Sequence, residues 1–181
     1  MAPNRIWTLG DLLSPAVDLA ALREHCRVDT SDEAAVLQRM ALAATLAVEK
    51  EAQRVLVRRQ AVLRTSYLPV GRCGLALPGG AVSAVTAMNI EGTAFTAFEV
   101  IGDSPAQMIP DADWPTLTQE GYPVSVTYTV GPAVPPVDLA VAVLMLAAEM
   151  FERRSEGNAG AVNRVPVSAA SLIGRRRIMP R

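Results

Sequence analysis

The residues whose side chains could carry out chemistry are few and scattered. The single histidine, His25, stands next to Cys26, and the only other cysteine is Cys73. A histidine activates a thiol only when the two side chains reach each other. Neighbouring residues on a helix point about 100° apart, so His25 and Cys26 do not form a dyad by sequence proximity. The pattern favours a histidine at the surface or at the edge of a core.

A second candidate is the pair Asp111 and Asp113, in a proline-rich stretch. Two carboxylates could bind a divalent cation, but a calcium loop needs further oxygen ligands and a final glutamate, which are missing here. The run Asp113-Trp114-Pro115 instead predicts a turn, with Trp114 packing the loop down. No phosphate-binding loop, serine-hydrolase elbow or zinc-protease motif occurs. We therefore predict no catalytic residue, no metal site and no cofactor, and a protein that is not an enzyme.

Arginines give the chain an uneven charge. Residues 157–181 carry a net charge of +5 and no acid, whereas residues 1–156 carry −6. The basic end contains Arg164, Arg175, Arg176, Arg177 and Arg181. A basic tail on an acidic body predicts an acidic partner, either a protein surface or DNA phosphate, and a solvated end is the simpler alternative. Aromatic residues are only 4% of the chain, which disfavours a stacking surface for single-stranded nucleic acid.

Composition allows a sizeable core but leaves its use open. Half of the 181 residues are hydrophobic, and 19% are charged, below the usual quarter. The low charge fits either a well-packed globule or a protomer that buries surface against its neighbours. The cysteines form no CxxC pair, and the first 15 residues lack a basic stretch followed by a long apolar run. We therefore expect synthesis and retention in a reducing cytoplasm.

Helical periodicity predicts helices over residues 17–28, 32–55 and 136–155. Thr30 or Ser31 would cap the second helix, whose alanines let another helix approach closely. The third helix begins after two prolines and is apolar almost all round. Its charged residues bracket only ten apolar ones, about half of what a membrane span needs, so we expect a buried helix and no membrane.

Alternation of apolar and polar residues predicts four short strands. They are expected at residues 58–65, 81–90, 94–101 and 124–130, the last being the most regular. Glu91-Gly92-Thr93 signals a hairpin between the second and third strands. Residues 1–15 and 102–123 are expected to be irregular.

These elements predict an α+β fold, mainly α, made of a helical bundle with a β-rich insertion over residues 58–131. Residues 1–157 would form one domain, and residues 158–181 an extended basic C-terminal tail. Within that tail, residues 166–173 could form one or two helical turns, ended by Gly174.

The order of several short motifs resembles the head–tail connector, or adaptor, family of long-tailed bacteriophages and gene transfer agents. The resemblance covers about residues 12–157. The motifs are Leu22–Asp29 with Ser31-Asp32-Glu33, Val48–Ala52, Leu75–Val85, Asp113-Trp114-Pro115, Val124–Gly131, Val134-Pro135-Pro136 and Met150–Gly157. Cys26, Phe151 and Arg153 depart from the family's usual residues, without threatening the fold.

This resemblance implies a structural subunit of a virion or gene-transfer-agent particle, at the head–tail junction. Subunits would form a ring of 12 copies beneath the portal, with the portal protein on one side and stopper or tail-completion proteins on the other. Packaged double-stranded DNA would pass through the lumen without sequence-specific contact.

Two groups of residues carry this hypothesis. The portal-binding tail would use Arg164, Leu172, Ile173, Arg175, Arg176, Arg177, Ile178 and Arg181, and would be loose in the free protomer. Subunit packing would use Leu37, Met40, Ala44, Val48, Leu144 and Phe151. The alternative is a small DNA-binding regulatory protein that uses the arginine-rich tail, which the acidic body disfavours.

Overall fold

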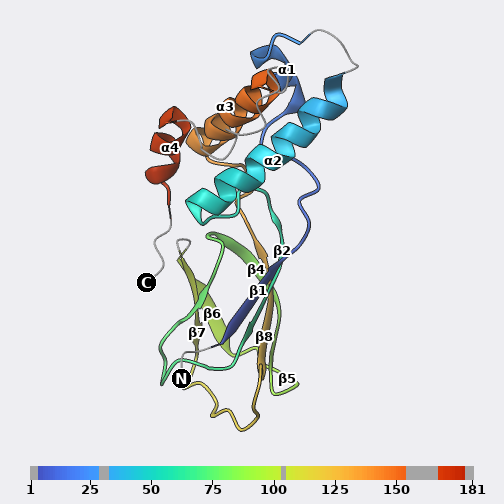
Figure 1. The fold of residues 1–181 in the computed structure, drawn as a ribbon. Coiled ribbons are helices and arrows are strands. Elements are labelled where there is room, and N and C mark those ends of the chain that lie inside the picture. Colours follow the sequence, from blue (N-terminus) through green and yellow to red (C-terminus); the bar gives the residue numbers. More distant parts are fainter. Residues whose placement is uncertain (1–3, 29–32, 103–104, 154–166, 178–181) are drawn as a thin grey trace. The chain divides into compact units, whose positions relative to one another are not determined.

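The computed structural model describes residues 4–28, 33–102, 105–153 and 167–177 (Figure 1). The chain forms two compact units. One, the β unit, combines Met1–Asp11 with Arg58–Pro132, and the other, the helical unit, combines Leu12–Val57 with Ala133–Arg181.

The expected mainly helical bundle is wrong. The structure is 33% helix and 27% strand, with two antiparallel sheets and four helices in its described part. Strands β1 (Arg5–Leu9) and β7 (Ala106–Pro110) lie in segments expected to be irregular, and β3 (Leu75–Leu77) lies where no strand was predicted. The strand expected over residues 94–101 is instead two strands, at 93–94 and 98–101, which belong to different sheets. Strands β1, β3 and β7 are short, and β1 and β3 pair with residues far along the chain, so pairing rather than a local pattern stabilises them. Strand β7 pairs both with β3 and with residues 98–101, just before it in the chain.

The larger sheet has the strand order β1-β2-β8-β4-β5, with every neighbour antiparallel. Its other strands are β2 (Arg59–Thr65), β8 (Val124–Val130), β4 (Val82–Ile90) and β5 (Thr93–Ala94). Along β8 every second residue is buried, as the alternating sequence predicted. One face of this sheet therefore forms part of the core of the β unit.

The smaller sheet has the order β3-β7-β6, where β6 is Phe98–Ile101. Buried residues alternate along β3 and β7 as well. The buried Tyr128 of β8 donates a hydrogen bond from its hydroxyl to the carbonyl of Pro78, just after β3, at 2.9 Å. This bond joins the buried face of the larger sheet to the smaller sheet, and burial raises the pKa of Tyr128.

The predicted hairpin at residues 91–93 is confirmed. Ile90 pairs with Thr93, and the two residues between them, Glu91 and Gly92, have φ of 51° and 82°. Two positive φ values are what a tight two-residue hairpin turn requires. The Glu91 carboxylate accepts hydrogen bonds from the backbone N–H of Gln119, at 2.7 Å, and from the N–H of Thr118. These bonds lower the pKa of Glu91 and tie the loop that precedes β8 to the hairpin.

The predicted packing of Trp114 is also confirmed. The indole is 7% exposed, and its ring centroid lies 5.6 Å from that of Phe95. Its Nε1–H donates a hydrogen bond to the carbonyl of Cys73 at 2.8 Å. The polar N–H group of the buried indole therefore has a hydrogen-bond partner.

In the helical unit, three predicted helices are present with shorter bounds. They are α1 (Leu19–His25), α2 (Ala34–Ala52) and α3 (Val137–Arg153). Asp18 caps α1 by accepting from the N–H of Ala20. Glu33 occupies the cap position of α2, and the predicted caps Thr30 and Ser31 lie outside the described residues. A fourth helix, α4 (Val167–Gly174), forms where one or two turns were expected, within the tail expected to be extended.

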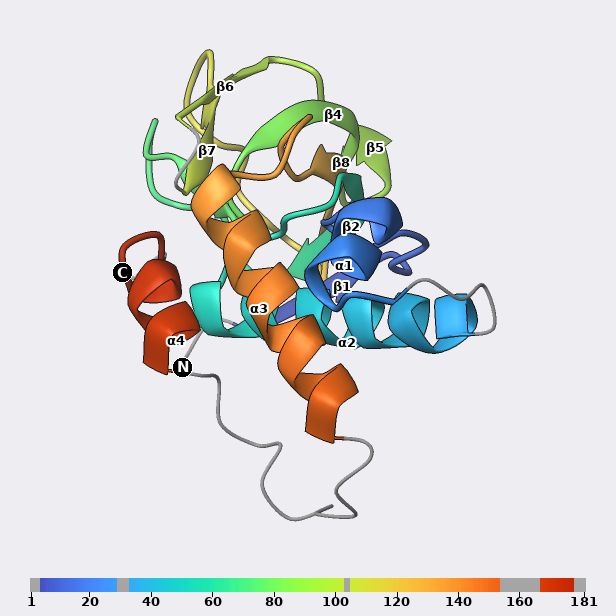
Figure 2. The same cartoon turned by 90° about the horizontal axis from the view of Figure 1, so that it is seen from above.

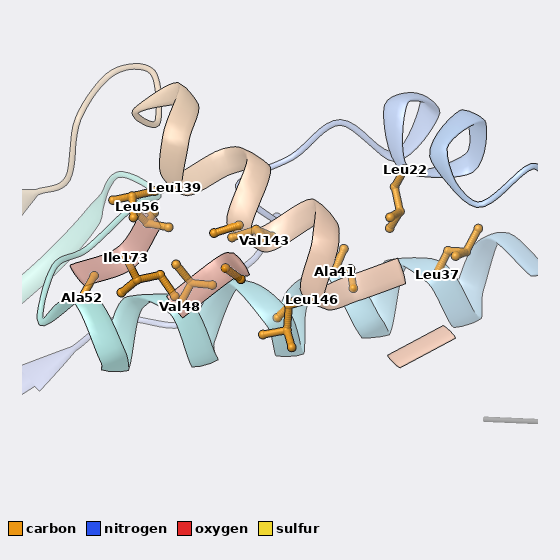
Figure 3. Close-up of a cluster of buried hydrophobic side chains, with 14 residues drawn as sticks. Leu22, Leu37, Ala41, Val48, Ala52, Leu56, Leu139, Val143, Leu146 and Ile173 are labelled. Atoms are coloured by element: carbon orange, nitrogen blue, oxygen red, sulfur yellow. The ribbon is translucent and has the colours of Figure 1, made fainter. Parts of the chain in front are cut away.

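The core of the helical unit lies where α3 crosses α2 (Figures 2 and 3). The alanines of α2 let the helices approach closely, as expected from the sequence. Fully or almost fully buried members include Leu22, Leu37, Ala41, Ala44, Val48, Ala52, Leu56, Leu139, Ala142, Val143, Leu146, Ala147, Ala169 and Ile173. All four helices therefore contribute to one core.

Glu49, near the C-terminal end of α2, binds the backbone of the segment that follows the helix. Its side chain is almost buried, with 8% of the residue exposed. One carboxylate oxygen accepts from the N–H of Leu56 at 2.7 Å and from the N–H of Val57 at 3.4 Å. Glu49, within the Val48–Ala52 motif, thus holds the segment that leaves the helix.

Candidate assembly interface

The C-terminal segment is anchored to the helical unit by its apolar residues. Ala169 and Ile173, one turn apart on α4, are 0% and 1% exposed and join the core formed by α2 and α3 (Figure 3). Leu172 is half-buried and packs against the same core. Two of the residues predicted to bind a portal, Leu172 and Ile173, thus contact the protomer itself.

Ion pairs hold the residues that follow α4. Arg176 donates from Nε to a carboxylate oxygen of Asp138, at the start of α3, at 2.7 Å. Arg177 lies 3.5 Å from a carboxylate oxygen of Glu51 on α2. All four side chains keep at least a quarter of their surface exposed, so each pair contributes little to stability on its own. Together they fix the direction in which the chain leaves α4.

Asp138 responds electrostatically to this contact. Partial burial acts to raise the pKa of its carboxyl group, but the hydrogen bond and positive charge of Arg176 outweigh it, and the pKa falls below its usual value. The contact therefore favours the ionised carboxylate, and protonation of Asp138 weakens it.

Arg175 differs from the two arginines that follow it. It is exposed, and within the described residues its guanidinium has no ion pair. Arg164, Ile178 and Arg181, the other predicted portal-binding residues, lie outside the described residues. Arg175 is thus the described arginine of the tail that is available to a partner.

The whole tail was expected to be loose in the free protomer. At residues 167–177 the structure instead has a helix and ion pairs that contact the helical unit. The reason is the apolar run of α4, because burial of Ala169 and Ile173 against α2 and α3 removes their apolar surface from water. Helical periodicity in residues 166–173 signalled the helix, but a hydrophobic run this short does not reveal where it docks.

The six residues predicted to pack between subunits occupy two different environments. Leu37, Ala44 and Val48 are 0% exposed, inside the protomer's own core. Met40, Leu144 and Phe151 are half-buried, so part of each side chain remains exposed to solvent. Packing between subunits remains a prediction for this group, and the structure places the available surface on the second set.

Sequence reasoning missed a more exposed part of α3. Val137 and Val141 lie one turn apart with 78% and 43% of their surface exposed, and Val134, just before the helix, is 76% exposed. The signal was present, because a helix that is apolar all round has more apolar surface than one contact can bury.

The residues first considered for chemistry do not form a site. His25 is exposed at the end of α1, and burial, followed by the charge of Glu152, raises the pKa of the half-buried Cys26 thiol, which disfavours the reactive thiolate. Asp111 and Asp113 are both exposed. Across the described ranges, no three histidine, cysteine or carboxylate side chains gather as metal ligands. In the same ranges, no helix has the length and hydropathy to cross a membrane.

Three solved structures similar to this chain come from gene transfer agent particles. A chain in the neck of an empty gene transfer agent particle, computed with C6 symmetry, is 28% identical, with a TM-score of 0.77 over 100% of this chain and 97% of that chain. A chain in the neck of the native particle, computed with C12 symmetry, is 26% identical, with a TM-score of 0.73 over 96% and 97%. A chain in the virion of the native particle is 26% identical, with a TM-score of 0.68 over 100% and 97%. No protein-family model and no curated protein matches the sequence.

These similarities first define a class, the structural components of a particle neck. More specifically, they confirm the resemblance to the head–tail connector family of phages and gene transfer agents. The similarity spans both units, including the β strands that were not expected.

Proposed function

We propose that this chain is the head–tail connector subunit of a gene transfer agent or phage particle, in which copies form a ring beneath the portal. The observation that carries the proposal is similarity over the whole length of neck-chain structures, at 28% identity. The ring joins the portal to stopper or tail-completion proteins, and packaged DNA passes through its lumen. Ring symmetry in two of the similar structures supports an oligomer, and C12 symmetry in one supports 12 copies.

On this proposal the basic end of the chain contacts the portal. Arg176 and Arg177 orient it through Asp138 and Glu51, and Arg175 offers an exposed charge. A regulatory protein that binds DNA through the same arginines is less well supported, because two of the three neighbouring arginines already pair with carboxylates.

The test is a deletion of the gene in a particle-producing strain, complemented by the full chain. We expect electron micrographs of the deletion strain to show filled heads and free tails that do not join, and complementation to restore joined particles. Joined particles without the protein would overturn the proposal.

A charge reversal tests the portal contact separately. Arg175→Glu should lower the recovery of portal protein with the tagged chain, while Arg72→Glu, an exposed arginine of the β unit, should leave it unchanged. A gel shift with duplex DNA at two salt concentrations tests the alternative, since phosphate binding weakens steeply with salt.

A further inference from the structure

The helical unit has an uncovered apolar stripe on α3. Val137, Val141 and Leu144 follow one another at spacings of four and three residues, so they lie on one side of the helix. Val137 and Val141 are exposed, whereas Leu144 is half-buried and part of its side chain packs against the core. The half-buried Ala140 lies beside them, and its small side chain permits close approach of another helix. We call these four residues the α3 stripe.

A second apolar stripe lies on α2. Leu46 is 49% exposed, Ala43 is exposed and Leu42 is half-buried. We call these three residues the α2 stripe. Exposed basic residues, Arg39 and Lys50, lie one turn before and after it. The stripe thus has an apolar centre with a charged rim, which is the pattern of a protein–protein contact.

The two stripes lie on different faces of the same unit. Helix α2 contacts α3 through a side that contains Ala41, Ala44 and Val48, and the α2 stripe lies away from it. Helix α3 meets α2 through Leu139, Val143 and their neighbours (Figure 3). The exposed members of the α3 stripe, Val137 and Val141, do not belong to this core. Neither stripe can therefore cover the other within one protomer.

A cyclic ring needs two such surfaces. In a ring with a single rotation axis, one surface of each subunit meets a different surface of the next. The ring itself rests on the function proposed above, and similar neck chains were solved with C12 and C6 symmetry. We propose that the α3 stripe of one copy packs against the α2 stripe of the next copy around the ring. The partner is a second copy because both stripes are helical and apolar, each with one alanine among larger aliphatic side chains, and because ring closure uses both.

The first experiment is site-directed cross-linking in particles. In a Cys26→Ser, Cys73→Ser background, the chain carries Ala43→Cys and Val141→Cys, and purified particles are treated with a bismaleimide. We expect a ladder of cross-linked copies with the double variant and none with either single variant. Dimers from a single variant would show that one stripe meets itself and would overturn the proposal. Absence of a ladder in particles that contain the chain would overturn it too.

This design separates the interface from the function on which it rests. If particles contain the chain but give no ladder, the interface is wrong while the connector function stands. If the unsubstituted chain is absent from particles, the connector function fails and the interface fails with it.

A second experiment uses charges. Val141→Glu and Leu46→Glu should each lower incorporation into particles at least ~10-fold, because an unpaired carboxylate would be buried in the contact. Val70→Glu, at an apolar residue of the β unit that is 90% exposed, is the matched control and should be incorporated normally. Thermal unfolding of each purified variant should match the unsubstituted chain, since all three sites are on the surface of the protomer. Normal incorporation of both stripe variants would overturn the proposal.

Discussion

Glu49 offers the sharpest test of how the helical unit is built. Glu49→Ala removes the acceptor of the Leu56 N–H, which is buried with its residue at 0% exposure. A hydrogen bond to a charged acceptor is worth about 1.5–3 kcal/mol, and a buried donor left unpaired costs a similar amount. The 3.4 Å contact with the Val57 N–H adds little. We therefore expect the free energy of unfolding of the helical unit to fall by about 2 kcal/mol.

Glu51 provides a matched control two residues away on the same helix. Its carboxylate lies 3.5 Å from Arg177, and both side chains are about half exposed. Glu51→Ala should therefore change stability by less than about 0.5 kcal/mol. The change in helix propensity is the same for both substitutions and cancels in the comparison. Glu49→Gln keeps one carbonyl oxygen as acceptor and should fall between the two.

The assay is urea denaturation monitored by circular dichroism, together with hydrogen exchange at the Leu56 amide. A loss of 2 kcal/mol corresponds to exchange about 30-fold faster at that amide. Equal stability of the Glu49→Ala and Glu51→Ala variants would refute the reasoning. So would unchanged exchange at Leu56, because the donor would then have another acceptor.

Three further predictions concern other contacts. Ile173→Ala should detach α4 from the core, because truncation of a buried isoleucine costs about 2–5 kcal/mol and a terminal helix can unfold locally. Hydrogen exchange should become faster over Val167–Gly174 but not in α2. The control Ala170→Ser, at an exposed site, should have no such effect. The pKa of Asp138 is lowered in the folded protein, so its contact with Arg176 stabilises the end of α4 above the ordinary aspartate pKa and is lost as the pH falls through the lowered value. Hydrogen exchange in α4 should therefore become faster below about pH 4. Asp138→Asn should abolish that pH dependence. Trp114→Phe removes the donor to the Cys73 carbonyl and should destabilise the β unit by about 1–2 kcal/mol in thermal unfolding, whereas an unchanged midpoint would show that the bond contributes nothing.

Local signals in the sequence were sufficient where one short segment contains the whole interaction. The hairpin at Glu91-Gly92 follows from turn chemistry, and the burial of every second residue in β8 follows from its alternation. Helices α1, α2 and α3 follow from periodicity, although each begins and ends one to three residues inside its predicted range. The strands β1, β3 and β7 could not be found in this way, because each is at most five residues long. Strands β1 and β3 also depend on partners far along the chain.

The helical tail shows the same limit. Its arginines and its short apolar run are plain in the sequence, yet the sequence leaves open whether they face a partner, DNA or solvent. Burial of Ile173 and the pairing of Arg176 and Arg177 depend on where α2 and α3 place Asp138 and Glu51. Among the arginines of the tail that the structure describes, all three are exposed and Arg175 is the one without an ion pair.

Helix α3 shows most clearly what belongs to each level. Its sequence establishes an uncharged helix, apolar on every side between Asp138 and Glu149, and hence more apolar surface than a single contact can bury. The same sequence cannot say which side faces inward, because an all-round apolar pattern has no preferred direction. Packing against α2 makes that choice: it buries Leu139 and Val143 and leaves Val137 and Val141 exposed.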